Sequence, residues 1–201
     1  MKLLKNTTSP FARLAHAMLI EAGATVQVEL LNPWADPDAL TRVNPARRVP
    51  TLILDDGTIL TEAMLIAQHA VRLSPAESHL RADDPQQLSI AGLGFGVIEA
   101  AVYIMTGRKI ISDDLAVTEF DSHPVAERRR RAMAEGLTQL EARADCLSHQ
   151  RLGLAELIVA DAIQYIDFRF PHAGWRPAIP RLDDWLRDAM AHPSLRDTVP
   201  S

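Results

Sequence analysis

The sequence has little of several things that would place it in a specialised class. One cysteine in 201 residues excludes a disulfide scaffold and any metal site built from several cysteines. A reducing compartment is the default for such a chain, so we expect a cytoplasmic protein. No run approaches the roughly 18 apolar residues of a membrane helix, so we expect no membrane partner. The chain begins Met1-Lys2-Leu3-Leu4-Lys5 and then turns polar, so we also expect no signal peptide.

An excess of positive charge is missing as well. The chain has 21 Lys and Arg against 26 Asp and Glu, a formal net charge of −5, whereas nucleic-acid binding favours a basic face. The run Arg128–Arg131 points around most of a helix, with Glu127 and Glu135 nearby, so it predicts a solvated helix. We therefore expect no nucleic-acid partner. The seven histidines show no metal-ligand spacing, so we expect no metal either.

The hydrophobic patterns divide the chain into two parts. The first part predicts a strand at 3–4, a helix from Pro10 to a stop at Gly23, a strand at 25–30, a short helix at 36–43, a hairpin over 51–60 and a helix over 62–73. The second part predicts helices over 86–107, 123–149, 154–170 and 181–191. We expect an α/β domain over 1–76, a linker over 77–85, and an all-helical domain over 86–201.

A glycine cluster lies in the first helix of the second part. Gly92-Leu93-Gly94-Phe95-Gly96 is similar to a dinucleotide-binding loop, but no strand precedes it and no glycine follows at the sixth position. The cluster therefore predicts close helix packing or a kink.

Ser9-Pro10 is the first of three candidate site signals. Ser9 places a hydroxyl at a helix N-terminus, where backbone N–H groups and the helix dipole favour an anion. A bound thiolate would be stabilised there and its thiol pKa lowered. The alternative is a plain helix cap, because Ser is a leading N-cap residue.

The other two signals follow in the same part of the chain. Val49-Pro50 precedes a strand; a cis bond there would leave the Val49 backbone open to an extended ligand, whereas the alternative is an ordinary trans proline. Glu62-Ala63 opens a helix whose N–H groups could hold a ligand carboxylate while Glu62 receives an ammonium. The alternative is an acidic residue that suits the helix dipole.

In their order and spacing these motifs resemble the glutathione S-transferase family, specifically a bacterial, serine-type member. The matching segments are Thr8–Arg13, Asn44–Leu52, Asp56-Gly57, Leu60–Ala63 with Ile66-Ala67, Leu157–Asp161, Pro180–Leu182, Trp185 and His192–Ser194. The resemblance implies a thioredoxin-like first domain, an all-helical second domain and a homodimer.

The resemblance also implies a role for each candidate residue. Ser9 would be catalytic and would hydrogen-bond the thiolate of glutathione, the co-substrate. Val49, before a cis Pro50, would pair with the cysteinyl backbone. Glu62 and Ala63 would hold the γ-glutamyl end. Arg48 or Trp34 would approach the glycyl carboxylate.

Three positions depart from the family pattern. Ala63 stands where Ser is usual, and one lost hydrogen bond to a charged group costs on the order of 1.5–3 kcal/mol. Arg47 stands where Gly is common. Ile158 stands where the family prefers a Ser or Thr N-cap ahead of Asp161, and Ile cannot cap a helix.

Two functions remain open. The first is a detoxifying transferase that joins glutathione to a small, largely apolar electrophile, with Phe95, Glu99 and Tyr103 as candidates for the wall of the electrophile pocket. These three residues are equally compatible with a packed core or interface. The second is a non-catalytic dimer of the same fold that binds a ligand or a protein partner, which Ala63 favours slightly. Thiol–disulfide exchange is disfavoured because no cysteine lies near position 9.

Overall fold

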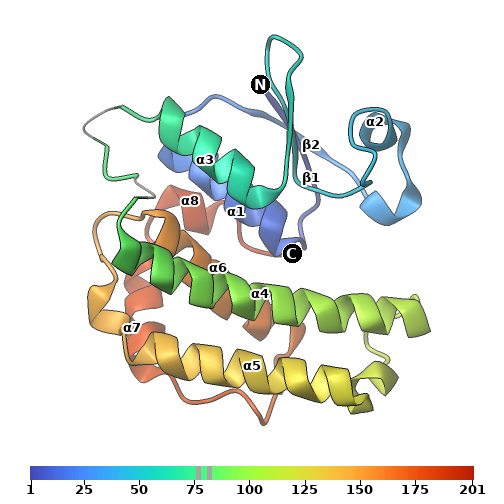
Figure 1. Cartoon of the computed structure of the whole chain (residues 1–201), viewed down its shortest axis with the longest axis vertical. Coiled ribbons are helices and arrows are strands. Elements are labelled where there is room, and N and C mark those ends of the chain that lie inside the picture. Colours follow the sequence, from blue (N-terminus) through green and yellow to red (C-terminus); the bar gives the residue numbers. More distant parts are fainter. Residues whose placement is uncertain (76–77, 81–82) are drawn as a thin grey trace.

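All the strands of the described chain lie in its first 61 residues. The computed structural model describes residues 1–75, 78–80 and 83–201 (Figure 1). The first part contains β1 (Lys2–Lys5), α1 (Pro10–Glu21), β2 (Gln27–Leu30), η1 (Pro33–Ala35), α2 (Asp38–Thr41), β3 (Thr51–Ile53), β4 (Ile59–Thr61) and α3 (Ala63–Leu73). The second part contains α4 (Pro85–Ile111), η2 (Glu119–Ser122), α5 (Pro124–Glu141), η3 (Ala144–Cys146), α6 (Leu154–Arg169), α7 (Pro180–Ala189) and α8 (Pro193–Arg196). The predicted α/β-then-helical fold class is confirmed. The linker expected over 77–85 includes residues 77, 81 and 82, which lie outside the described residues.

The sheet has the strand order β2-β1-β3-β4. β1 and β2 are parallel and are joined across α1, whereas β3 is antiparallel to both β1 and β4. Parallel strands need such a crossover, and antiparallel ones can be joined by a short turn. Gly57 makes that turn possible, since its φ of 86° is a conformation that costs glycine little. The predicted hairpin is confirmed.

Helix α1 joins the two parts of the molecule. It lies beside α3 in the first part, and its other side faces α6 (Figure 1). Arg13 of α1 is 2% exposed and donates from Nη1 to Oδ1 of Asp161 on α6, at 3.3 Å. Its Nε donates to Oγ1 of Thr198 and its Nη2 to the Leu195 carbonyl, both at 3.3 Å. One buried guanidinium therefore connects α1 to α6 and to the C-terminal segment.

The long helices of the second part approach closely at two glycines. A Cβ at Gly94 of α4 would lie 2.8 Å from Ile158 Cγ2 on α6, and a Cβ at Gly136 of α5 would lie 2.5 Å from Val97 Cγ2 on α4. The predicted close packing is confirmed at Gly94. It is wrong at Gly92 and Gly96, where a Cβ would meet nothing within 4 Å. Within the described residues α4 alone is long and apolar enough to cross a membrane by length and composition, and half of its most apolar window is buried.

One expectation about a helix end is wrong, and one short helix was not predicted. The helix expected over 123–149 ends at Glu141, whose carboxylate accepts the backbone N–H groups of Arg181 and Leu182 at the start of α7, each at 3.0 Å. The chain then turns through η3. The short helix α8 has no counterpart in the sequence prediction.

Ile158 does not occupy a capping position. It lies within α6 and is fully buried, because the helix begins four residues earlier, at Leu154. The helix start is held instead by Glu156, whose Oε2 accepts the Gly153 N–H at 3.0 Å. Asp161 is likewise a helix-interior residue, and its partner is Arg13.

A titratable cluster surrounds the Arg13–Asp161 pair. Burial raises the pKa of Asp161 to about 7, with Arg13 opposing the shift. Lys5 of β1 is 7% exposed, and its Nζ lies 3.3 Å from Nδ1 of His16 on α1. Burial, assisted by the Lys5 cation, lowers the pKa of His16 from 6.5 to about 4. His16 therefore stays neutral in the folded protein at pH values where an unfolded chain would protonate it.

The glycine contacts predict opposite effects for two alanine substitutions in α4. Gly94→Ala should lower the free energy of unfolding by about 1–3 kcal/mol, because the β-branched Ile158 side chain cannot rotate away. Gly96→Ala should raise it by about 0.5–1 kcal/mol, because alanine is the better helix former and its methyl group enters open space. Urea unfolding of both variants checks this, and equal effects of the two substitutions would contradict the close contact with Ile158.

The lowered pKa of His16 predicts an acid-sensitive contribution to stability. Between pH 6.5 and 4 the unfolded state binds a proton at His16 that the folded state does not, so this contribution is lost as the pH falls through that window. His16→Gln should therefore lose less stability than the unmodified protein between pH 7 and pH 4.5.

Urea titrations at several pH values measure this difference. His172→Gln, at an exposed histidine, is the matched control and should follow the unmodified protein. The buried Asp161 shift acts in the opposite direction in both proteins, so only the difference between them reports on His16. Parallel curves for His16→Gln and the unmodified protein would refute the assignment.

Candidate functional site

The three candidate segments meet at one end of the sheet. Leu4 pairs with Thr51, and Thr51 pairs with Thr61. Because β3 runs against β1 and β4, its beginning lies beside the ends of those two strands. Ser9 follows β1, Pro50 precedes β3 and Glu62 follows β4, so strand register brings the segments together although 53 positions separate Ser9 from Glu62.

Ser9 is the N-cap of α1. Its Oγ accepts the Ala12 N–H at 3.2 Å, and its own N–H donates to Oδ1 of Asn6 at 3.0 Å. The capping interpretation is confirmed, and it does not exclude the other one. A hydroxyl carries one donor and two acceptor sites, and capping uses an acceptor. The hydroxyl proton has no acceptor among the described residues, so it is available to an anion.

The bond between Val49 and Pro50 is cis, as predicted. The loop before it is held by Asn44, whose Nδ2 donates to the Arg48 carbonyl and to Oγ1 of Thr51, each at 2.9 Å. Within the described part of the chain, the N–H and C=O of Val49 make no hydrogen bond. They are therefore open to pair with an extended peptide backbone.

Glu62 has a backbone conformation that is rare for its residue type. Its φ is 66° and its ψ is 128°, and strained backbone of this kind persists where the surrounding structure holds it, often at ligand sites. Its side chain makes no capping bond to α3, so the first N–H groups of α3, including that of the buried Ala63, lack intrahelical partners. The Glu62 Oε1 instead accepts from Nη2 of Arg48 at 2.5 Å.

The backbone conformation at position 47 explains why glycine is common there, where this chain has Arg47. Arg47 has a φ of 54°, which is the left-handed region that favours glycine. Its Nη1 lies 2.6 Å from Oδ2 of Asp36, which also has a positive φ. Trp34 lies two residues before Asp36, in η1, and is 62% exposed. Its ring centroid lies 5.9 Å from Nζ of Lys109 on α4. The side chains of the glycyl-end candidates Arg48 and Trp34 are thus both exposed.

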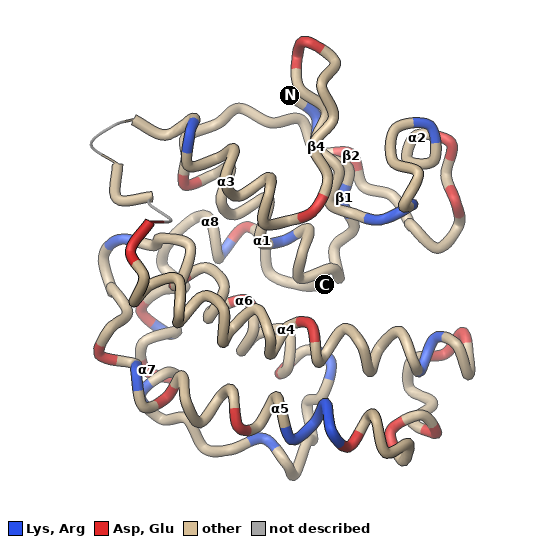
Figure 2. The backbone as a smooth tube through the Cα atoms, viewed as in Figure 1, with Lys and Arg blue, Asp and Glu red and all other residues tan. Residues whose placement is uncertain are grey.

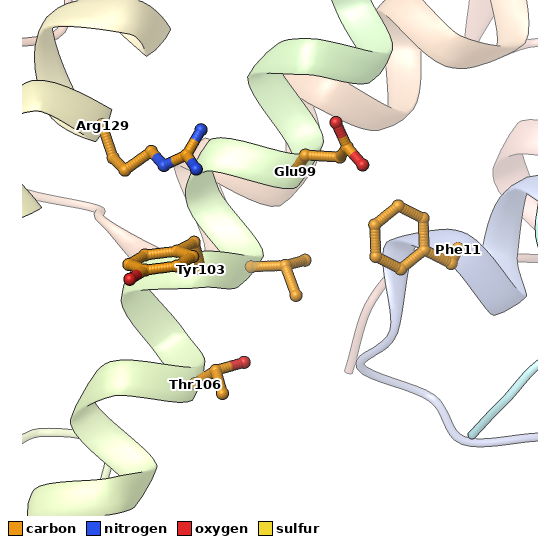
Figure 3. Close-up of a pocket in the computed structure, with 6 residues that line it drawn as sticks. Phe11, Glu99, Tyr103, Thr106 and Arg129 are labelled. Atoms are coloured by element: carbon orange, nitrogen blue, oxygen red, sulfur yellow. The ribbon is translucent and has the colours of Figure 1, made fainter. Parts of the chain in front are cut away.

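A pocket of about 300 Å³ lies between α1 and the long helices. Its lining residues are Phe11, Glu99, Val102, Tyr103, Thr106 and Arg129 (Figure 3). Phe11 comes from the first turn of α1, two residues after Ser9, and faces α4 across the pocket. Of the three residues expected in an electrophile pocket, the structure places Glu99 and Tyr103 in this lining. Phe95 is not part of the lining, and its ring contacts that of Phe11 in a tilted arrangement, with centroids 5.4 Å apart and an interplanar angle of 47°.

The sequence analysis missed four of the lining residues. Val102 and Thr106 could have been found, because positions 99, 102, 103 and 106 form one stripe of a helix. Phe11 and Arg129 carry no such signal, since helix packing alone brings them to α4. Within residues 1–75, 78–80 and 83–201, no group of three or more His, Cys, Asp or Glu side chains could hold a metal ion.

Comparisons with known proteins show what the chain is similar to. Residues 8–73 match the model of the glutathione S-transferase N-terminal domain. The uncharacterized GST-like protein YibF of Escherichia coli K12 is 25% identical over 205 residues, covering 100% of this chain and 98% of YibF.

Two solved structures extend the likeness over the whole chain. A Pseudomonas fluorescens glutathione transferase family member, with bound S-(propanoic acid)-glutathione, superposes with a TM-score of 0.78 at 26% identity and 100% coverage of both chains. A Methylobacterium radiotolerans glutathione S-transferase, in complex with glutathione sulfonate, gives a TM-score of 0.82 at 27% identity, covering 99% of this chain and 94% of that one.

Residues 8–73 therefore form a glutathione S-transferase N-terminal domain, and the whole chain has the glutathione S-transferase fold. Its first part is the thioredoxin-like unit of that fold, and its second part is the helical one. Within the family, the two solved relatives hold glutathione derivatives.

Proposed function

We propose that this protein is a glutathione transferase in which Ser9 stabilises the thiolate of glutathione for attack on a small electrophile. The observation that carries the proposal is the meeting of Ser9, Val49 and Glu62 at one end of the sheet. The pocket that begins at Phe11 lies next to this group in the chain. The glutathione derivatives held by the two solved relatives support the same ligand here.

Each anchor has a distinct role in the proposal. The Ser9 hydroxyl donates to the sulfur, and the α1 N-terminus adds its dipole. The backbone of Val49, before Pro50, pairs with the cysteinyl unit. Glu62 and the N–H of Ala63 hold the ammonium and carboxylate of the γ-glutamyl end. Arg48 or Trp34 meets the glycyl carboxylate.

Binding of the γ-glutamyl ammonium requires Glu62 to exchange partners. Its carboxylate is held by Arg48 in the ligand-free chain, at 2.5 Å. Both side chains are more than half exposed, and exposed pairs contribute only about 0–1 kcal/mol. The ammonium can therefore displace Arg48, which is then released toward the glycyl end.

The chemical step joins sulfur to carbon. The thiol loses its proton to solvent, the thiolate sulfur forms a bond to the electrophilic carbon, and that carbon releases its leaving group with the bonding electron pair. Lowering the thiol pKa raises the fraction of thiolate at neutral pH. Such conjugation in the cytoplasm would serve detoxification.

A non-catalytic binding protein of the same fold is the second candidate. Ala63 favours it, because its side chain lacks the hydroxyl that the family usually supplies to the γ-glutamyl carboxylate. Turnover separates the two candidates, since a binding protein would retain glutathione without conjugating it.

We further propose that residues 1–76 and 86–201 are separate domains, and that the second supplies most of the electrophile pocket.

Replacing Ser9 tests the catalytic role. Ser9→Ala should raise the apparent thiol pKa of bound glutathione and lower kcat/KM toward 1-chloro-2,4-dinitrobenzene by about 10- to 150-fold, because a hydrogen bond to a charged group contributes roughly 1.5–3 kcal/mol. The glutathione Kd should change less, since the other anchors hold the rest of the tripeptide. pH–rate profiles and calorimetry measure the two effects.

The loss of a helix cap needs its own control. Asp84→Ala removes a comparable cap from α4, where Asp84 Oδ1 accepts the Gln86 N–H at 2.9 Å. Both variants should lose about 1 kcal/mol of stability. If Ser9→Ala lowered the melting temperature as Asp84→Ala does and left the thiol pKa unchanged, Ser9 would be a cap alone.

We also propose a homodimer, because large apolar side chains remain exposed on the outer faces of α3 and α4. Leu65 is 54% exposed and Leu88 is 40% exposed, and closed two-fold pairs are the commonest oligomers. Light scattering should return about twice the chain mass of 22.2 kDa, and Leu65→Glu should shift the protein toward the monomer. A mass of one chain at working concentration would contradict the proposal.

A further inference from the structure

The electrophile pocket contains a cation that the proposed reaction leaves unused. Arg129 is one of four consecutive arginines on α5, visible as a basic segment in Figure 2. Among these four, Arg129 is the one that lines the pocket, and its guanidinium lies 4.8 Å from the centroid of the Tyr103 ring. In the described part of the chain Arg129 forms no ion pair and no hydrogen bond.

The position of the Arg129 guanidinium over the Tyr103 ring leaves its N–H groups available to bind an anion. A guanidinium that lies on an aromatic face keeps the N–H groups along its edge available, and these groups match the two oxygens of a carboxylate. The ring also restrains the long arginine side chain, so less conformational freedom is lost when a ligand binds. The hydroxyl of Thr106, on the same side of α4 as Tyr103, adds a further polar group to the lining.

Glu99 and Arg129 place opposite charges on the two sides of the pocket. Its carboxylate lies on the side toward Phe11, while Arg129 lies over Tyr103 on the other side (Figure 3). The two charges do not pair with each other within the described residues. A ligand carboxylate is therefore repelled from the α1 side of the pocket and attracted to the Arg129 side. The uncharged part of the same ligand is left facing α1, where Ser9 begins the helix.

We propose that the electrophile is a small molecule that carries a carboxylate group, which Arg129 binds with support from Tyr103 and Thr106. This inference rests on the proposed transferase function and names the class of its second substrate. A pocket of about 300 Å³ is at the lower end of the range for small-molecule sites, which fits a single ring or a short chain. The carboxylate lies against Arg129, and the reacting carbon points toward the glutathione sulfur.

A matched pair of electrophiles tests the charge requirement. In 4-chloro-3-nitrobenzoate and 4-chloro-3-nitrobenzamide, sulfur attacks the carbon that bears chlorine, a carbon–sulfur bond forms, and chloride leaves while the thiol proton passes to solvent. The two compounds have similar size and shape and differ in charge. The readout is the ratio of kcat/KM for the benzoate to kcat/KM for the benzamide, each corrected for the uncatalysed rate.

Arg129→Gln should lower this ratio by about two- to fivefold at low ionic strength, as expected for loss of one charge pair in a solvent-exposed site. Arg129→Lys should restore part of the ratio, because it keeps the charge without the planar fork. Arg128→Gln is the matched control: it removes a neighbouring exposed arginine that does not line the pocket, and it should leave both rates unchanged.

The outcomes separate this inference from the function on which it rests. A ratio that falls in Arg129→Gln and stays constant in Arg128→Gln supports both. Turnover of both compounds with a ratio that Arg129→Gln does not change overturns the carboxylate inference and leaves the transferase function standing. Absence of glutathione binding by calorimetry in the unmodified protein overturns both.

Discussion

The buried pair of Arg13 and Asp161 is the interaction on which the geometry of the site depends. Both side chains are almost fully removed from solvent, and such a pair is tolerated when further hydrogen bonds satisfy its charges. Arg13 has them, because Thr198, Gln164 and the Leu195 carbonyl also accept from its guanidinium, whereas Oδ2 of Asp161 has no partner among the described residues. Losing Asp161 would leave the Arg13 charge buried and uncompensated, which is far more costly than losing an exposed pair. Helix α1 is thereby fixed on α6, and with it Ser9 at its first end and Phe11 at the wall of the pocket.

A second constraint comes from the sheet. Reversal of β3 relative to β1 and β4 brings Ser9, Val49 and Glu62 to one sheet end, where each supplies backbone or side-chain groups that the sheet itself does not use. The local cost is visible in the left-handed backbone of Arg47 and the positive φ of Glu62. Positive φ is unfavourable for side-chain-bearing residues, so the rest of the first part must hold these residues in place. The candidate site is therefore formed by loop residues that the end of the sheet holds in position.

Short sequence motifs predicted most of the helices and strands. The features that they did not predict depend on contacts between segments that are distant in the sequence. Ser9-Pro10 predicts the start of α1, and Gly57 predicts the turn of the hairpin. Both predictions succeed because the helix start and the turn are each determined by residues within four positions of one another in the sequence. The end of α5 at Glu141 was not predicted, and the contact of the Glu141 carboxylate with the backbone of residues 181 and 182 joins segments that are distant in the sequence. Arg129 is the clearest case in the site. Its run of arginines predicts a solvated helix, and only the close approach of α4 and α5 at Gly136 places one of the four over Tyr103.

In the proposed transferase, the absence of a hydroxyl at position 63 would affect glutathione affinity more than catalysis. Ala63 is 4% exposed, and its backbone N–H still lies at the α3 N-terminus, so the γ-glutamyl carboxylate would keep one donor and the helix dipole. A missing hydrogen bond of about 1.5–3 kcal/mol corresponds to roughly 10- to 150-fold in Kd. The proposed thiolate contact at Ser9 follows a different strand, β1, and would not be changed by this substitution. Reduced affinity would therefore appear as a higher KM for glutathione, with the rate at saturation set by Ser9 and by the fit of the electrophile against Arg129.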